Sequence, residues 1–228
     1  MLEQLRKHMN WILWATLALI IVTFLFFGVY PSSTTGRTVA RVNDDIISYE
    51  EWNRSYQNLT ETYRQIFKDQ FNEGFVKILR NQALQELIQN RLLIQEAERV
   101  GIRISDDELR DSIRAIPAFN PGGRFDNKTY EYYLNRINMT PAVFEATQRE
   151  FLRRQRLVRI VEDSVDVTEE DVAAALKADP KKRMSTQKEK DALRQQLLTR
   201  KRQDALSAYV AGLKQQAKIK IDERYATL

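Results

Sequence analysis

The chain contains no cysteine and one histidine, His8. Without thiols it has no disulfide framework and no thiol nucleophile, and a single imidazole argues against zinc sites and against Ser-His or Cys-His catalysis. Glycine is scarce as well, at seven residues, and no Gly-rich loop that could cradle phosphate occurs. The composition therefore predicts no catalytic residue, no metal site and no cofactor.

Charge is missing from one long stretch. No charged residue occurs from Met9 to Gly36, and Trp11–Tyr30 within it is almost wholly apolar. As a helix rising about 1.5 Å per residue, that segment would span about 30 Å, the hydrocarbon thickness of a bilayer. Its length, its aromatic ends and the lack of a small-residue cleavage site favour a permanent anchor over a cleaved signal peptide. We expect a cytoplasmic tail at 1–10, a single transmembrane anchor at 11–30, and export of the remainder.

A short polar linker, residues 31–37, precedes two segments with strand character. Thr38–Ser48 alternates around an Asn-Asp turn and predicts a β-hairpin. Lys218–Asp222 alternates polar and apolar residues and predicts a strand. A lone hairpin is marginal in water, so the sequence predicts that this last strand pairs with Val39–Val42 and joins the two ends of the exported chain.

Between these strands the apolar residues recur at helical spacing. Ser or Thr precedes most of the expected helices, often with an acidic residue three positions later, as in a capping box. The expected helices are 48–69, 75–100, 105–116, 127–138, 140–162, 168–178 and 186–217, with a Pro/Gly-rich loop at 116–126. The predicted fold is mainly α, with one small antiparallel β element.

Positive charge is concentrated near the C-terminal end. Lys177–Lys220 holds 13 Lys/Arg against 4 Asp/Glu, while the whole chain carries a net charge of +5. Such a segment could contact anionic lipid or an acidic polypeptide, or it could be an ordinary solvated helix face. No nucleic-acid-binding motif accompanies it, so nucleic acid is not an expected partner.

A run of short motifs in fixed order begins in the Pro/Gly-rich loop. The motifs are Ile116-Pro117-Ala118-Phe119, Phe125-Asp126, Tyr130, Met139-Thr140-Pro141 and Phe144-Glu145. Together with the VARVNDDIIS hairpin, this run resembles the chaperone domain of the SurA/PpiD group of bacterial periplasmic folding factors. The N-terminal anchor makes the chain similar to the membrane-held branch of that group.

The resemblance implies a domain layout with one departure. Residues 38–178 would form a SurA N-terminal-like chaperone domain, and 186–228 would supply a C-terminal helix and strand that complete it. In the group, a parvulin prolyl isomerase domain stands where this chain has only the loop 179–185. Parvulin sites use histidines and this chain has only His8, so the resemblance implies that the isomerase domain is absent and that the chain is not an enzyme.

The function implied by the resemblance is that of an inner-membrane-anchored, ATP-independent periplasmic chaperone. Its partners would be unfolded exported or outer-membrane polypeptides, the inner-membrane lipid and the secretion translocon, with homo- or hetero-oligomers as a further possibility. The alternative is an anchored adaptor or assembly factor that binds one folded partner, such as a parvulin-bearing homologue.

Five apolar residues in or after the Pro/Gly-rich loop are the candidates for peptide binding. They are Phe119, Phe125, Tyr133, Met139 and Phe144. Exposed apolar patches often mark binding sites, and methionine adapts to varied partners. The alternative is that these residues form the small core of a second lobe.

Overall fold

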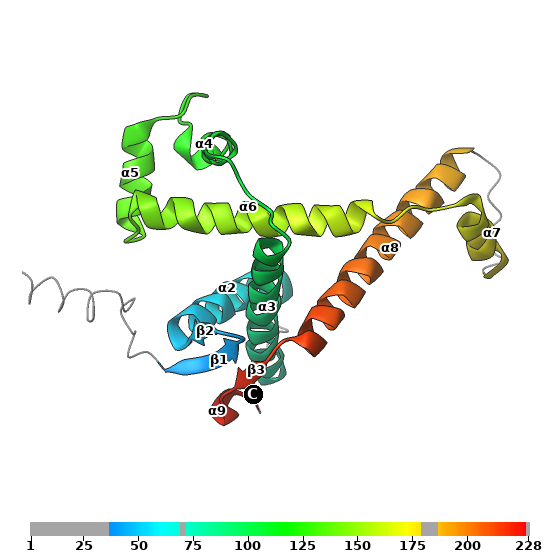
Figure 1. Ribbon diagram of the computed structural model, residues 1–228, viewed down its shortest axis with the longest axis horizontal. Helices are drawn as coiled ribbons and strands as arrows, with labels where there is room; N and C mark the ends of the chain where they lie inside the picture. The colour runs from blue at the N-terminus through cyan, green and yellow to red at the C-terminus, as the bar shows by residue number, and fades with distance from the viewer. Residues whose placement is uncertain (1–36, 69–71, 179–186, 227–228) are drawn as a thin grey trace, which may run out of the picture. The chain divides into compact units, whose positions relative to one another are not determined.

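The computed structural model describes residues 37–68, 72–178 and 187–226. This part of the chain is mainly helical, with one small antiparallel sheet (Figure 1). In chain order the elements are β1 (Thr38–Val42), β2 (Asp45–Ser48), α2 (Tyr49–Phe67), α3 (Glu73–Arg99), α4 (Asp106–Arg114), η2 (Pro117–Phe119), α5 (Asn127–Arg136), α6 (Pro141–Asp163), α7 (Glu169–Ala178), α8 (Gln187–Gln216), β3 (Ile219–Ile221) and α9 (Glu223–Ala226).

Four of the predicted segments lie outside the described residues. These are the cytoplasmic tail at 1–10, the anchor at 11–30, most of the linker at 31–37, and the loop at 179–185. Within the described ranges, no helix combines the length and the apolar character needed to cross a bilayer.

The sheet joins the two ends of residues 38–228, as the alternation predicts. Its strand order is β2-β1-β3 with both pairings antiparallel, so the C-terminal strand adds to the N-terminal hairpin. Asn43, in the left-handed region at φ 54°, occupies the hairpin turn. Its backbone N–H donates to the Lys218 carbonyl, and the Lys218 N–H donates to the Asn43 Oδ1, each at 2.9 Å. The predicted third strand is confirmed.

The inner face of the sheet packs on α2 and α3. Val39, Val42 and Ile47 are fully buried there beside Trp52 of α2. Ser48 caps α2 by accepting the Glu51 backbone N–H at 3.2 Å, as predicted.

The reciprocal half of the predicted capping box at this helix is wrong. The Glu51 carboxylate accepts two hydrogen bonds of 3.1 Å from Arg91 of α3 instead of returning to the cap. A hydrogen bond from a guanidinium to a carboxylate pairs two opposite charges and is stronger than one from a neutral backbone N–H. The Glu51 carboxylate therefore links α2 to α3.

Helix α3 contacts α2, α6 and α8, which accounts for its unusually broad apolar stripe. Leu93 and Ala97 lie in a separate cluster with Leu157 of α6 and Val210 of α8. The helix ends at Gly101, whose φ of 78° suits a residue without Cβ.

Helix α8 changes neighbours along its length. Near its start Leu193 packs with Val172 of α7, and further on Val210 joins the cluster with α3 and α6. Between them lies the polar stretch 199–204, whose sequence TRKRQD by itself favours a solvent-exposed position. In the structure Lys201 bonds Asp171 at 2.6 Å and Arg202 bonds Asp163 at 3.2 Å, so part of this stretch holds neighbouring elements together.

Candidate functional site

A second small core lies between α4, η2, α5 and the first half of α6, a region we call the aromatic subdomain. Phe119 stands at its centre. Ring centroids lie 5.2 Å away for Tyr130, 5.8 Å for Phe144, 6.0 Å for Tyr133 and 6.4 Å for Phe125, all in edge-to-face contact. This geometry matches the quadrupoles of the rings and gives the cluster a defined arrangement.

The loop before α5 is held by its own polar groups. The Asn120 side-chain amide donates to the carbonyls of Arg114 at 2.6 Å and Ile116 at 3.0 Å. Asp126 caps α5 by accepting the Thr129 hydroxyl at 2.5 Å and its backbone N–H at 3.1 Å. These bonds from Thr129 lower the pKa of Asp126 below its usual value. The Pro/Gly-rich loop thus has a defined conformation, held by these hydrogen bonds, and it packs Phe119 against α5.

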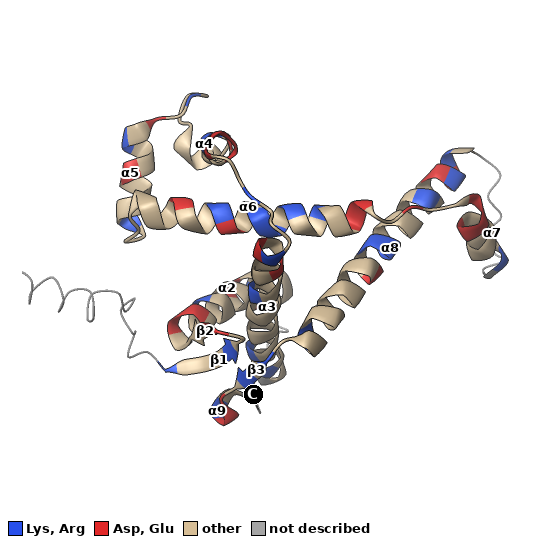
Figure 2. Ribbon diagram, viewed as in Figure 1, with Lys and Arg blue, Asp and Glu red and all other residues tan. Residues whose placement is uncertain are grey.

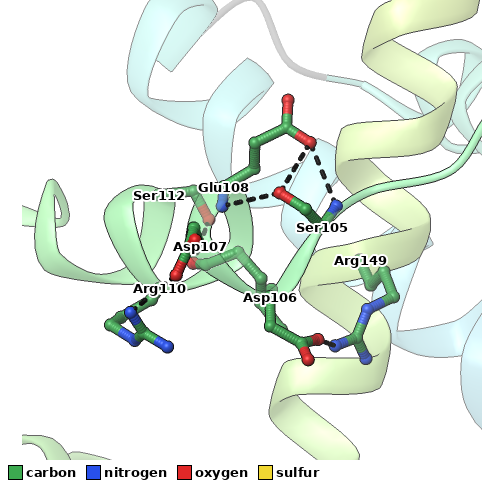
Figure 3. A network of polar contacts seen from close by, with 8 residues as sticks. Ser105, Asp106, Asp107, Glu108, Arg110, Ser112 and Arg149 are labelled. Carbon is green, nitrogen blue, oxygen red and sulfur yellow. Dashed lines mark hydrogen bonds and ion pairs between the residues drawn. The ribbon is translucent and has the colours of Figure 1, made fainter.

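Charged groups attach α4 to α6. Figure 3 shows the Glu108 carboxylate turned back onto Ser105 to complete a capping box, and Arg149 of α6 reaching Asp106. The Asp106–Arg149 pair measures 2.8 Å, and Arg156 of α6 also bonds Glu108. The hydrogen bond from Ser105 and the pairing with Arg156 lower the pKa of Glu108. Exposed pairs such as these are screened by solvent and add little, so the apolar contacts of Leu109 and Ile113 with the rest of the cluster carry most of the attachment.

A cleft of about 300 Å³ opens on the subdomain between α4, α5 and α6. Its lining combines apolar and aromatic side chains with charged ones: Asp106, Leu109, Arg110, Ile113, Arg114, Phe125, Asn127, Tyr130, Glu145 and Arg149. The Tyr130 hydroxyl is buried without a hydrogen-bond partner among the described residues, and burial raises its pKa. A cleft lined in this way can accept an apolar side chain, with polar groups available around it.

Apolar side chains also stand in solvent around the turn from α5 to α6. Tyr132 is 63% exposed, Ile137 55%, Val143 52% and Tyr133 38%. Single exposed apolar residues are ordinary, but four of them between residues 132 and 143 make this turn a candidate binding surface. We call these four residues the apolar face.

The structure brings all five predicted peptide-binding residues into the aromatic subdomain. Phe119 is only 5% exposed and forms the core itself, while Phe125, Met139 and Phe144 are half-buried against that core. Of the five, Tyr133 alone belongs to the apolar face. Four of the five predicted residues therefore belong to the core of the subdomain or pack against it, and only Tyr133 is part of the apolar face.

Three residues of the apolar face were not among the predicted ones: Tyr132, Ile137 and Val143. The helical spacing in the sequence places Ile137 on one face of its helix with Tyr130, Tyr133 and Leu134. The four-residue spacing of Tyr133 and Ile137 was the available signal, because it marks a second stripe beside that of Tyr130 and Leu134. Of these four, the structure buries only Tyr130 and Leu134.

These helices, together with a small sheet that joins the chain ends, have the fold of SurA-like chaperones. A solved structure described as one of two structurally related SurA-like chaperones of Campylobacter jejuni, PEB4 and Cj1289, superposes with a TM-score of 0.53. The match covers 82% of this chain and 99% of that one, at 11% sequence identity. Residues 1–158 match the family described as the SurA-like N-terminal domain, and the chain belongs to that family.

Curated relatives agree with the resemblance inferred from the motifs. The periplasmic chaperone PpiD of Escherichia coli K12 is 34% identical over 166 residues, which are 69% of this chain and 27% of that protein. The chaperone SurA of Hahella chejuensis is 27% identical over 146 residues, 62% of this chain and 32% of that protein. The chain thus spans about a quarter to a third of the length of these relatives.

Proposed function

We propose that the chain is an inner-membrane-anchored periplasmic chaperone that holds unfolded, newly exported polypeptides without ATP. The observation that carries the proposal is the apolar face, whose side chains are kept in solvent over the packed core around Phe119. Relatives named as periplasmic chaperones support it. The proposal places 1–10 in the cytoplasm, 11–30 in the membrane, and 38–178 with 186–228 as one periplasmic chaperone domain.

Holding by such a face is weak enough to be reversible. A client segment that buries on the order of 200 Å² of apolar surface gains about 5 kcal/mol at about 25 cal/mol/Å². The cost of association, about 4 kcal/mol or more, leaves little net affinity for one contact. Release then follows from folding of the client, because the chaperone binds the unfolded state alone. Neither nucleotide nor a prolyl isomerase step is part of this mechanism.

Met139 and the cleft of the same subdomain add adaptability. Met139 packs half-buried against the core, and an unbranched thioether adjusts to differently shaped partners. The cleft offers Leu109 and Phe125 to a client side chain, with Arg114 and Glu145 at the same opening. A surface of this composition suits clients that share apolar character rather than one sequence.

Site-directed crosslinking tests the proposal, and the lack of native cysteine makes it specific. A photoreactive label is attached at Ile137→Cys in the full chain in lipid nanodiscs, with Ile160→Cys as the control because Ile160 is exposed to the same extent on the other end of α6. Unfolded outer-membrane polypeptides are expected to crosslink at 137 and not at 160.

Equal crosslinking at the two positions would contradict the assigned face. Crosslinking at position 137 to a folded, parvulin-bearing homologue, with none to unfolded polypeptides, would favour the adaptor function instead. Carbonate washing of native membranes tests the anchor separately, since an anchored chain stays in the membrane pellet.

A further inference from the structure

Like charges face each other on the outer side of the sheet. Arg41 of β1 lies directly opposite Lys220 of β3, and both side chains are exposed. Directly opposed residues share one face of a sheet, and like charges in that position are destabilising. Among the described residues, the Arg41 guanidinium makes one long hydrogen bond, of 3.4 Å, to the Asp44 carbonyl. An anionic ligand bound at this position would relieve the repulsion between Arg41 and Lys220.

Lys218 adds a third cation to this site. A recess of about 390 Å³ is lined by Arg41, Asn43, Asp44, Lys218 and Lys220, which gives three cations against one carboxylate. In the part of the chain that the structure describes, none of the three cations forms an ion pair.

The cations of α8 behave differently from Lys218 and Lys220. Arg194 pairs with Glu169, Lys201 with Asp171 and Arg202 with Asp163, so these charges hold α8 to its neighbours. The basic C-terminal segment predicted from the sequence therefore divides in two. Its helical cations include several that stabilise packing, whereas Lys218 and Lys220 remain available to a partner.

An apolar side chain completes the same face. Ile46 of β2 lies opposite Arg41 in the register and is 46% exposed. Ile46, Arg41 and Lys220 thus form a row across the three strands, and Figure 2 marks the basic positions on β1 and β3. Basic and apolar side chains together on one surface suit an anionic bilayer, where the cations meet headgroup phosphates and the apolar group enters the interface.

We propose that the outer face of the sheet, made of Arg41, Ile46, Lys218 and Lys220, binds anionic lipid headgroups of the membrane that holds the chain. This inference rests on the proposed anchor. Residues 31–37 can extend about 25 Å at most, at about 3.6 Å per residue, so β1 begins close to the bilayer surface. A short tether keeps lipid at a high effective concentration, which favours lipid over a free acidic polypeptide.

The test uses the full chain with one label in vesicles. A polarity-sensitive fluorophore is placed at Ile46→Cys, and at exposed Ala146→Cys as the control position. In vesicles containing phosphatidylglycerol the label at 46 is expected to shift to shorter wavelength and to lose several-fold of its accessibility to iodide. Neither change is expected in pure phosphatidylcholine, at high salt, or at position 146.

Charge variants identify the residues responsible. Arg41→Gln, Lys218→Gln and Lys220→Gln together are expected to abolish the response at position 46. A charge-matched control, Lys128→Gln, Lys188→Gln and Lys190→Gln, removes three exposed lysines elsewhere and is expected to leave it intact.

Three results would overturn the proposal. One is an equal signal in neutral and anionic vesicles, and another is loss of the response in the control triple variant. The third is a response to an acidic unfolded polypeptide with none to anionic lipid, which would assign the face to polypeptides. Flotation separates the failures: a chain that does not float with vesicles refutes the anchor as well, whereas a floating chain without a label response refutes the lipid-binding face alone.

Discussion

Replacing Phe119 with alanine is expected to unfold the aromatic subdomain and leave the rest of the described structure folded. The side chain is 5% exposed and contacts four aromatic rings by their edges. Truncation of a buried phenylalanine costs about 3–5 kcal/mol. The subdomain core is small and separate from the core that contains Trp52, so a loss of this size exceeds what local packing can absorb.

Hydrogen exchange measured segment by segment is the assay for this variant. Amides of α4 and α5 are expected to lose protection by two or more orders of magnitude, since about 1.4 kcal/mol corresponds to a factor of ten. Amides of α3 and β1 are expected to keep theirs. The matched control is Phe151→Ala, because Phe151 is exposed on α6 and its truncation is expected to cost less than about 1 kcal/mol.

Two results would refute this reasoning. Unchanged amide protection in α4 and α5 would mean that Phe119 does not stabilise the subdomain core. Phe119 would then again be a candidate for direct contact with clients. Loss of protection throughout the chain would show that the separate clusters unfold as one cooperative unit.

Further predictions concern the joints between elements. Tyr209→Phe removes the 2.9 Å hydrogen bond from α8 to the buried Glu96 carboxylate and is expected to lower the free energy of unfolding by about 1.5–3 kcal/mol in urea titrations. The hydrogen bond from Arg99 is the main cause that lowers the pKa of Glu96. A lowered carboxyl pKa stabilises the fold fully at pH values above the carboxyl's pKa in the unfolded chain. The effect of Tyr209→Phe should therefore shrink as the pH falls through the pKa of Glu96 in the folded chain. The Asp171 carboxyl, bonded by Lys201, should titrate at a pKa of about 2 by NMR, and Lys201→Gln should raise it toward 3.8. Asn43→Ala removes the side-chain bonds to Lys218 and Gln95, and faster exchange is expected in β3 than in β2; equal rates would contradict the assigned role.

Local rules predicted the elements well. The Ser105–Glu108 capping box forms in full, and Gly101 follows the end of the helix predicted at 75–100. The third strand could be placed because an isolated hairpin needs a partner and the only other alternating segment lay at the far end of the chain. These features depend on neighbours in sequence or on one unavoidable pairing.

The departures come from contacts between distant segments. Glu51 leaves its cap because Arg91 lies within reach, and sequence spacing carries no information on that approach. The sequence groups Ile137 on one helix face with Tyr130 and Leu134, but helical spacing does not show how much of that face the core covers. The apolar face was therefore only partly predictable, since exposure depends on which of two adjoining stripes the core covers.

Aggregation of a client measured by light scattering tests the central claim most directly. An unfolded outer-membrane protein is diluted into buffer that contains the full chain in nanodiscs and no nucleotide, with empty nanodiscs as the blank. The account predicts suppression near stoichiometric amounts, retained by Ile160→Ser and lost when Tyr132, Ile137 and Val143 are together replaced by serine. Aggregation unaffected by the folded wild-type chain, or suppressed equally by the triple variant, would contradict it.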